Sequence, residues 1–123
     1  MSKFSITDRV RSFGYALNGL RVLLMKEHNA WLHLAAMCAV ISLGFALAIT
    51  RMEWIAAIVC IGMVLSAEAM NTAVEQICNY IKPEQDIRIM IIKDIAAAAV
   101  LILSITAAIV GMIIFGPKIY TLL

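Results

Sequence analysis

Residues 30–49 read AWLHLAAMCAVISLGFALAI, a stretch of 20 residues without a formally charged side chain. A helix rises 1.5 Å per residue, so about 20 apolar residues cross a hydrocarbon core about 30 Å thick. Because that core holds no water to satisfy free backbone groups, a spanning segment of this length is expected to be helical. The stretch therefore predicts a membrane-spanning helix.

Two further stretches downstream have the same character. Residues 53–81 form a run of 29 residues that is apolar at first and then carries Glu68 and Glu75. Residues 95–115 form a run of 21 residues without a charge, which Gly116-Pro117-Lys118 closes. Pro83 follows the second run and is expected to stop its helix. The sequence thus predicts three spans, at about 30–49, 53–81 and 95–115.

Residues 1–29 carry an amphipathic pattern instead of an apolar core, so no signal peptide is expected. Apolar residues recur at steps of four and three, which places them on one face of a helix that Ser5 or Thr7 could cap. A basic amphipathic helix beside a span is typical of the membrane surface, and packing against the other helices is the alternative. The apolar face consists of Ile6, Val10, Phe13, Leu17, Leu20 and Leu24.

The composition of the chain agrees with a membrane protein. It is 63% hydrophobic and 15% charged with a mean hydropathy of +0.96, whereas soluble proteins are roughly half apolar and a quarter charged. A soluble globular protein and a disordered chain are therefore excluded, and a net charge of +2 does not indicate a nucleic-acid partner. We expect an all-α membrane protein forming a single domain over residues 1–123.

Basic residues are distributed unequally between the two sides. Eight lie before the first span or between the second and third, whereas only Arg51 and Lys118 lie on the other side. The positive-inside rule then predicts a cytoplasmic N-terminus and an external C-terminus.

The acidic residues of the second span need a separate explanation. Glu68 lies about 22 Å along this helix from Glu53, at a depth where an ionisable group is costly unless it faces protein or water. Asn71, Thr72 and Glu75 follow at steps that put all four polar residues on one face. A polar seam between helices is one interpretation. Two carboxylates on that seam favour a functional interpretation, because they repel each other unless a cation neutralises them.

Further charges are expected at the cytoplasmic ends of the helices. Glu27 precedes the first span, and Lys93 and Asp94 open the third, where a snorkelling lysine beside a helix-start aspartate is the ordinary alternative. Carboxylates with Asn71 suit Mg²⁺, a lysine suits phosphate, and Glu68 could act as a base. The alanine run at 96–99 is equally consistent with tight helix packing and with the admission of a ligand. These residue types suggest phosphate chemistry on a lipid.

The pattern resembles the small bacterial integral-membrane diacylglycerol kinase family over nearly the whole chain. The resemblance rests on E-x-x-N-T-A-x-E at residues 68–75 and K-D-x-A-A-x-A-V at 93–100, together with Tyr15, Gly19 and Glu27. E-x-N-x-x-x-H at residues 27–33, with Glu53-Trp54, is similar to the undecaprenol kinase branch.

The resemblance implies a homotrimer whose active sites are shared between subunits, with ATP arriving from the cytoplasm and the lipid from the bilayer. It implies that Glu68 is the catalytic base, that Glu27 and Glu75 bind Mg²⁺, and that Ala97 and Glu68 contact the lipid. Arg9 is the nearest match to the family's N-terminal arginine, and Arg11 could substitute for it. The nucleotide-binding residues implied in this way are Arg9, Tyr15, Glu27, Asn71, Glu75, Glu84, Asp86, Lys93 and Asp94.

These observations predict an ATP- and Mg²⁺-dependent lipid kinase of the bacterial cytoplasmic (inner) membrane. Undecaprenol is the first choice of acceptor and diacylglycerol the second. One alternative is a small proton-coupled multidrug transporter, although such proteins usually have four spans and carry their glutamate in the first. The other is a purely structural membrane subunit, which leaves Glu68 and Glu75 unexplained.

Overall fold

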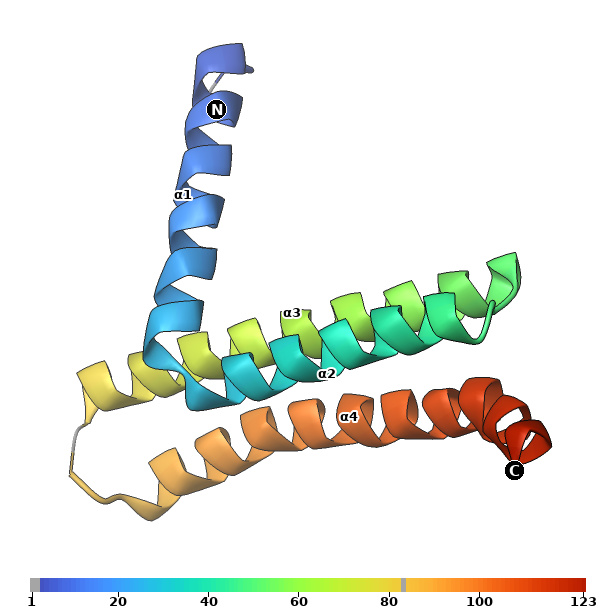
Figure 1. Ribbon diagram of the computed structural model, residues 1–123. Coiled ribbons are helices and arrows are strands. Elements are labelled where there is room, and N and C mark those ends of the chain that lie inside the picture. The colour runs from blue at the N-terminus through green and yellow to red at the C-terminus, as the bar shows by residue number, and fades with distance from the viewer. Residues whose placement is uncertain (1–2, 83) are drawn as a thin grey trace.

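The computed structural model describes residues 3–82 and 84–123, and within these residues it contains helices and no strand. The helices are α1 (Ile6–Lys26), α2 (His28–Ala46), α3 (Arg51–Ile81) and α4 (Ile87–Leu122). Figure 1 shows α2, α3 and α4 running alongside one another, with α1 projecting away from them. The last three are long and apolar enough to cross a membrane, which confirms the predicted class. Pro83 lies outside the described residues.

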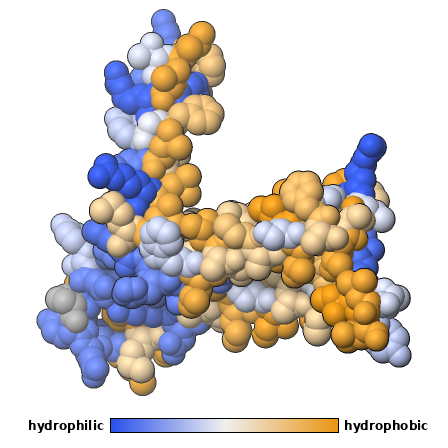
Figure 2. Space-filling view, in the orientation of Figure 1, coloured by the Kyte–Doolittle hydropathy of each residue, from blue (hydrophilic) through white to orange (hydrophobic). Residues whose placement is uncertain are grey.

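Helix α1 has the predicted amphipathic character. Ser5 caps it, because its Oγ accepts a hydrogen bond from the Asp8 N–H at 3.4 Å. The apolar face is exposed over most of its length, and only Leu23 near the end of the helix is buried. Figure 2 shows hydrophobic atoms along one side of α1 and hydrophilic atoms along the other. An apolar face that the chain itself leaves uncovered favours the membrane-surface interpretation over packing within the subunit.

Helix α2 ends at Ala46, three residues before the end of the apolar stretch. Ala48 adopts a positive φ of 50°, and its N–H donates to the Phe45 carbonyl at 3.3 Å. The next N–H, of Ile49, donates to the Gly44 carbonyl at 3.1 Å. This pair of hydrogen bonds around a left-handed residue closes a helix end. The chain can therefore reverse direction within a few residues.

Helix α3 begins with a reciprocal cap and is tied to the far end of α4. Thr50 Oγ1 accepts from the Glu53 N–H at 3.2 Å, and Glu53 Oε1 accepts from the Thr50 N–H at 2.9 Å. Lys118 Nζ lies 3.2 Å from the same Glu53 oxygen. Both side chains are partly exposed, so this ion pair contributes little to stability. Glu53 is thus a structural charge at the helix boundary.

Helix α4 is longer than its charge-free stretch at both ends. It begins at Ile87, because Asp86 caps it by accepting the Arg88 N–H at 2.8 Å. It also continues through Pro117 to Leu122, past the residues that were expected to close the span. Proline removes one backbone hydrogen bond and bends a helix without always ending it. Figure 1 shows the last turns of α4 bent away from its main axis.

Only a small core lies between the helices. Ile49, Ile114 and Phe115 are buried together, and Trp54 and Val110 pack against them. Most other apolar side chains of α2–α4 are exposed and form the hydrophobic middle of the molecule in Figure 2. Such a surface requires lipid or further protein to cover it.

The contact between α2 and α3 near this core gives a stability prediction. A Cβ at Gly44 would lie 2.6 Å from Cη2 and 2.8 Å from Cζ2 of Trp54, whose ring also packs on Phe45 with centroids 5.0 Å apart. Gly44→Ala is therefore expected to destabilise the protein by about 1–3 kcal/mol, the usual cost of overpacking. The measurement is the thermal unfolding midpoint in detergent micelles.

Gly62→Ala is the matched control, because a Cβ at Gly62 meets nothing within 4 Å. Alanine is intrinsically better than glycine in a helix by about 1 kcal/mol, so this midpoint should stay the same or rise. Equal midpoints for the two variants would contradict the steric argument.

Candidate active site

The most deeply buried side chain of the site is Glu68, which is 2% exposed on α3. His33 of α2 lies beside it, with its Nε2 atom 3.3 Å from Glu68 Oε2. A carboxylate in an apolar protein interior is costly unless a partner compensates it. His33 is that partner within the described chain.

Glu68 is in the middle part of α3, but it lies near the end of the bundle where α2 begins. His33 is five residues into α2, about 8 Å from the start of that helix. That start is the point where α1 joins the bundle, and Figure 1 places the connection between α3 and α4 at the same end. Hydrophilic residues gather there in Figure 2. The His33–Glu68 pair therefore lies just inside the polar end of the molecule.

The other polar residues of α3 share the inward face with Glu68, as their spacing predicted. Asn71 is 9% exposed, and its Nδ2 donates to Glu75 Oε1 at 3.3 Å. The Asn71 Oδ1 and Thr72 Oγ1 atoms are buried without a hydrogen-bond partner in the described chain. A buried polar atom left unpaired costs about 1–3 kcal/mol. Two such atoms on consecutive residues of α3 indicate that further polar groups are needed on this part of the helix.

Helix α4 contributes Lys93 to the polar end of the bundle. Lys93 Nζ donates to Asn79 Oδ1 at 2.7 Å, which links the polar ends of α3 and α4. Asn79 was not among the residues that sequence reasoning selected, and no motif marks it. Asp94 and Ala97 are exposed on the same helix. None of the four alanines at 96–99 is buried, so the run is not a tight packing surface within one chain.

Glu84 and Asp86 both lie in the connection between α3 and α4, but they differ in exposure and in their contacts. Glu84 is exposed. Asp86 accepts hydrogen bonds from Arg88 and lies 3.0 Å from Lys82 Nζ. The Arg88 guanidinium and then the Lys82 ammonium hold the pKa of the Asp86 carboxyl far below its usual range. Asp86 is thus committed to contacts within the chain, whereas Glu84 faces outward.

The N-terminal residues that were expected at the site lie further from Glu68. Glu27 is half-buried at the junction of α1 and α2, where its extended backbone separates the two helices. Arg9 and Tyr15 are exposed on α1, which projects away from the bundle in Figure 1. Arg11 lies 3.9 Å from Asp8 and is also exposed. A single chain therefore does not bring the α1 residues to Glu68.

The donor atoms present are suited to magnesium. The described chain gathers no group of three His, Cys, Asp or Glu side chains that could enclose a metal ion. Mg²⁺ usually takes only one or two carboxylates and completes its shell with water and phosphate oxygens. The half-buried Glu75 carboxylate and the unpaired Asn71 Oδ1 are oxygen donors of the required kind, so the residues fit this ion.

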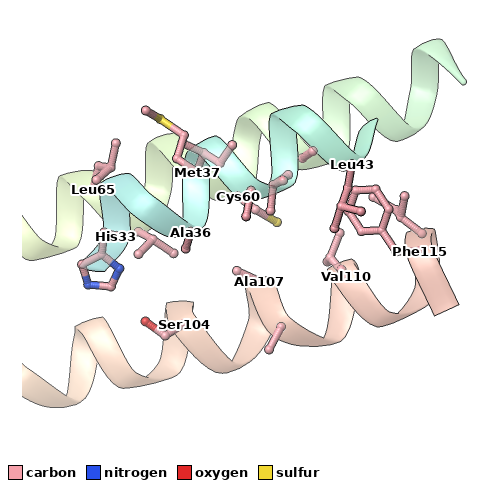
Figure 3. Close-up of a pocket in the computed structure, with 18 residues that line it drawn as sticks. His33, Ala36, Met37, Leu43, Cys60, Leu65, Ser104, Ala107, Val110 and Phe115 are labelled. Atoms are coloured by element: carbon pink, nitrogen blue, oxygen red, sulfur yellow. The ribbon is translucent and has the colours of Figure 1, made fainter. Parts of the chain in front are cut away.

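An apolar cavity of about 390 Å³ lies between α2, α3 and α4. Figure 3 shows His33 at one end of it, with the Ser104 hydroxyl close by and Phe115 toward the other end. The remaining lining is almost entirely apolar. The histidine that contacts Glu68 thus also borders a space suited to hydrocarbon.

Comparison with known proteins decides the family. The model of the prokaryotic diacylglycerol kinase family matches residues 14–115. The chain belongs to this family. A relative from Bacillus subtilis (strain 168), undecaprenol kinase, is 34% identical over 108 residues, which cover 88% of each chain. This member of the family is therefore a lipid kinase with several membrane spans, and the transporter and structural-subunit alternatives are set aside.

His33, like Asn79, is a residue of this region that sequence reasoning missed. Neither His28 nor His33 was assigned a role in the site from the sequence. The available signal was its place in E-x-N-x-x-x-H, six residues after Glu27. That spacing does not reveal the partner, because Glu68 lies on another helix.

Proposed function

We propose that this lipid kinase transfers the γ-phosphate of ATP to undecaprenol, with diacylglycerol as the second choice of acceptor. The observation that carries the proposal is a buried carboxylate, Glu68, whose partner His33 borders an apolar cavity. A lipid alcohol needs an apolar space for its chain and a base for its hydroxyl group. The undecaprenol kinase activity named for the Bacillus subtilis relative supports the order of the two acceptors.

In the proposed mechanism, Glu68 accepts the hydroxyl proton while the lipid oxygen attacks the γ-phosphorus and the bond to ADP breaks. Phosphoryl transfer depends mainly on alignment and on compensation of phosphate charge. Lys93 contributes one positive charge, and Asn71 offers its unpaired Oδ1 to the site. Glu27 and Glu75 would hold Mg²⁺, and the ion would supply positive charge to the phosphates.

The remaining nucleotide contacts are assigned by family resemblance. We assign Arg9 and Tyr15 of α1, Glu84 and Asp86 of the connection, and Asp94 of α4 to the ATP site. Asp86 is the weakest member of this set, because Arg88 and Lys82 already occupy its carboxylate. Its contribution is expected to come through the shape of the connection.

We further propose a homotrimer with active sites shared between subunits. Arg9 and Tyr15 project away from Glu68 within one chain, so a neighbouring subunit is the natural place for them to act. The exposed apolar surface of α2–α4 supports the same conclusion. The unequal distribution of basic residues favours the bacterial cytoplasmic membrane with the N-terminus and the active site on the cytoplasmic side. Ala97 is then open to lipid.

The test is a phosphate-transfer assay on purified protein in detergent micelles with labelled ATP, Mg²⁺ and either lipid. We expect label on both alcohols and a higher kcat/KM for undecaprenol. A higher kcat/KM for diacylglycerol would reverse the order of acceptors. Label on neither lipid would refute the proposed function.

A further inference from the structure

The pairing of His33 with Glu68 raises a question about the proton. Glu68 is 2% exposed, whereas the side chain of His33 is 22% exposed. If Glu68 removes a proton from the lipid hydroxyl, it becomes a neutral acid in a place with almost no access to water. A second turnover requires that this proton leave.

The geometry offers one route for it. His33 Nε2 lies 3.3 Å from Glu68 Oε2, and no other ion-pair partner of Glu68 is present in the described chain. The two residues come from different helices, α2 and α3, so their contact depends on the fold and not on sequence neighbourhood. His33 also lines the apolar cavity near Ser104, so it is adjacent to both the base and the expected position of the lipid.

We propose that His33 returns Glu68 to its carboxylate form by accepting the proton after each phosphoryl transfer. The inference rests on the proposed role of Glu68 as the base. The lipid O–H proton passes to Glu68 while the new O–P bond forms and ADP leaves with the electrons of the broken P–O bond. Neutral His33 donates its Nε2–H to the Glu68 carboxylate at rest and shifts that hydrogen to Nδ1 once Glu68 is protonated, so the Glu68 O–H proton then moves to the Nε2 lone pair. The partly exposed imidazolium loses a proton to water, so one proton is released per turnover.

In this scheme His33 is a positioning residue that acts through Glu68. Imidazole is the side chain best suited to accept and release a proton near neutral pH. A purely structural partner would need only to hydrogen-bond Glu68. Glutamine can do that, but it cannot carry the proton, so the two roles are separable by substitution.

The first test uses His33→Ala with added imidazole. We expect kcat to fall about 100-fold, which is within the range for proton-transfer catalysis, while KM for ATP and for the lipid alcohol stays nearly unchanged. Imidazole in the assay should restore much of the lost kcat in a concentration-dependent way. It should not restore Glu68→Gln, which lacks the base itself. His28→Ala is the matched control, since His28 is exposed at the start of α2.

The second test uses His33→Gln, which should remain as slow as His33→Ala. A wild-type kcat in His33→Gln would overturn the proposal, because a hydrogen bond alone would then suffice. A kcat of His33→Ala that imidazole fails to raise would overturn it as well. If His33→Ala does not assemble in micelles, His33→Asn takes its place in the rescue experiment.

The same assays separate this inference from the proposed function. Wild-type protein that phosphorylates neither lipid refutes the proposed function. Wild-type activity that Glu68→Gln abolishes and His33→Gln leaves intact refutes only the role of His33.

Discussion

Glu68→Gln is expected to lower kcat by about 10³-fold while the protein stays folded. Glutamine has nearly the same shape as glutamate and can still hydrogen-bond to His33, which lies 3.3 Å from the carboxylate. It cannot accept the proton of the lipid hydroxyl. General-base catalysis contributes about 10²–10⁴-fold to such reactions, and the low exposure of Glu68 leaves water little access to take its place.

The measurement is kcat at saturating Mg²⁺, ATP and lipid alcohol, with the thermal unfolding midpoint recorded on the same preparation. Glu53→Gln is the matched control. Glu53 is also a glutamate of α3, but it caps the helix and pairs with Lys118 at the opposite end of the bundle. We expect this control to lose some stability and to retain its kcat. A folded Glu68→Gln variant within a few-fold of wild-type kcat would contradict the assignment of the base.

The helices were predictable because a bilayer places strong demands on sequence. A charge-free stretch such as residues 95–115 indicates a spanning helix by its length alone. Their ends were less predictable, since caps and turns determine them. Asp86 starts α4 well before that stretch, and the positive φ of Ala48 ends α2 early. The continuation of α4 through Pro117 is a further local effect, because the loss of one backbone hydrogen bond does not by itself end the helix.

The arrangement of the candidate site residues was predictable only where they lie on one helix. Glu68, Asn71 and Glu75 follow helical spacing, so their common face could be derived from residue numbers. Contacts between helices depend on axial register, which hydropathy does not encode. The His33–Glu68 pair therefore emerges only from the structure, and the same is true of Lys93 and Asn79.

The distance of α1 from the rest of the site has a different origin. Its apolar face is suited to a membrane surface and not to the bundle, so nothing within one chain draws Arg9 or Tyr15 toward Lys93. In the proposed trimer a neighbouring subunit supplies that contact. Sequence reasoning about one chain identifies such residues by resemblance and cannot place them.

Glu75→Gln is expected to raise the Mg²⁺ concentration that gives half-maximal rate by at least about 10-fold. Substitution of a residue that only hydrogen-bonds to a metal ligand already lowers metal affinity by about that factor, and Glu75 is proposed as a ligand itself. The glutamine carbonyl can still accept the hydrogen bond that Asn71 Nδ2 donates to Glu75 Oε1 at 3.3 Å, so the packing of α3 should persist. High Mg²⁺ should then recover part of kcat, which distinguishes this variant from Glu68→Gln.

The measurement is initial rate against Mg²⁺ at fixed ATP, with Asp8→Asn as the control. Asp8 is also a carboxylate, and the orientation predicted from the basic residues places it on the cytoplasmic side as well. It is exposed on α1, where it pairs with Arg11, and it lies outside the proposed metal site. Its Mg²⁺ dependence should match that of the wild type. If Glu75→Gln also matches the wild type, Glu75 does not bind the ion, and its half-buried carboxylate serves only to hold the Asn71 amide.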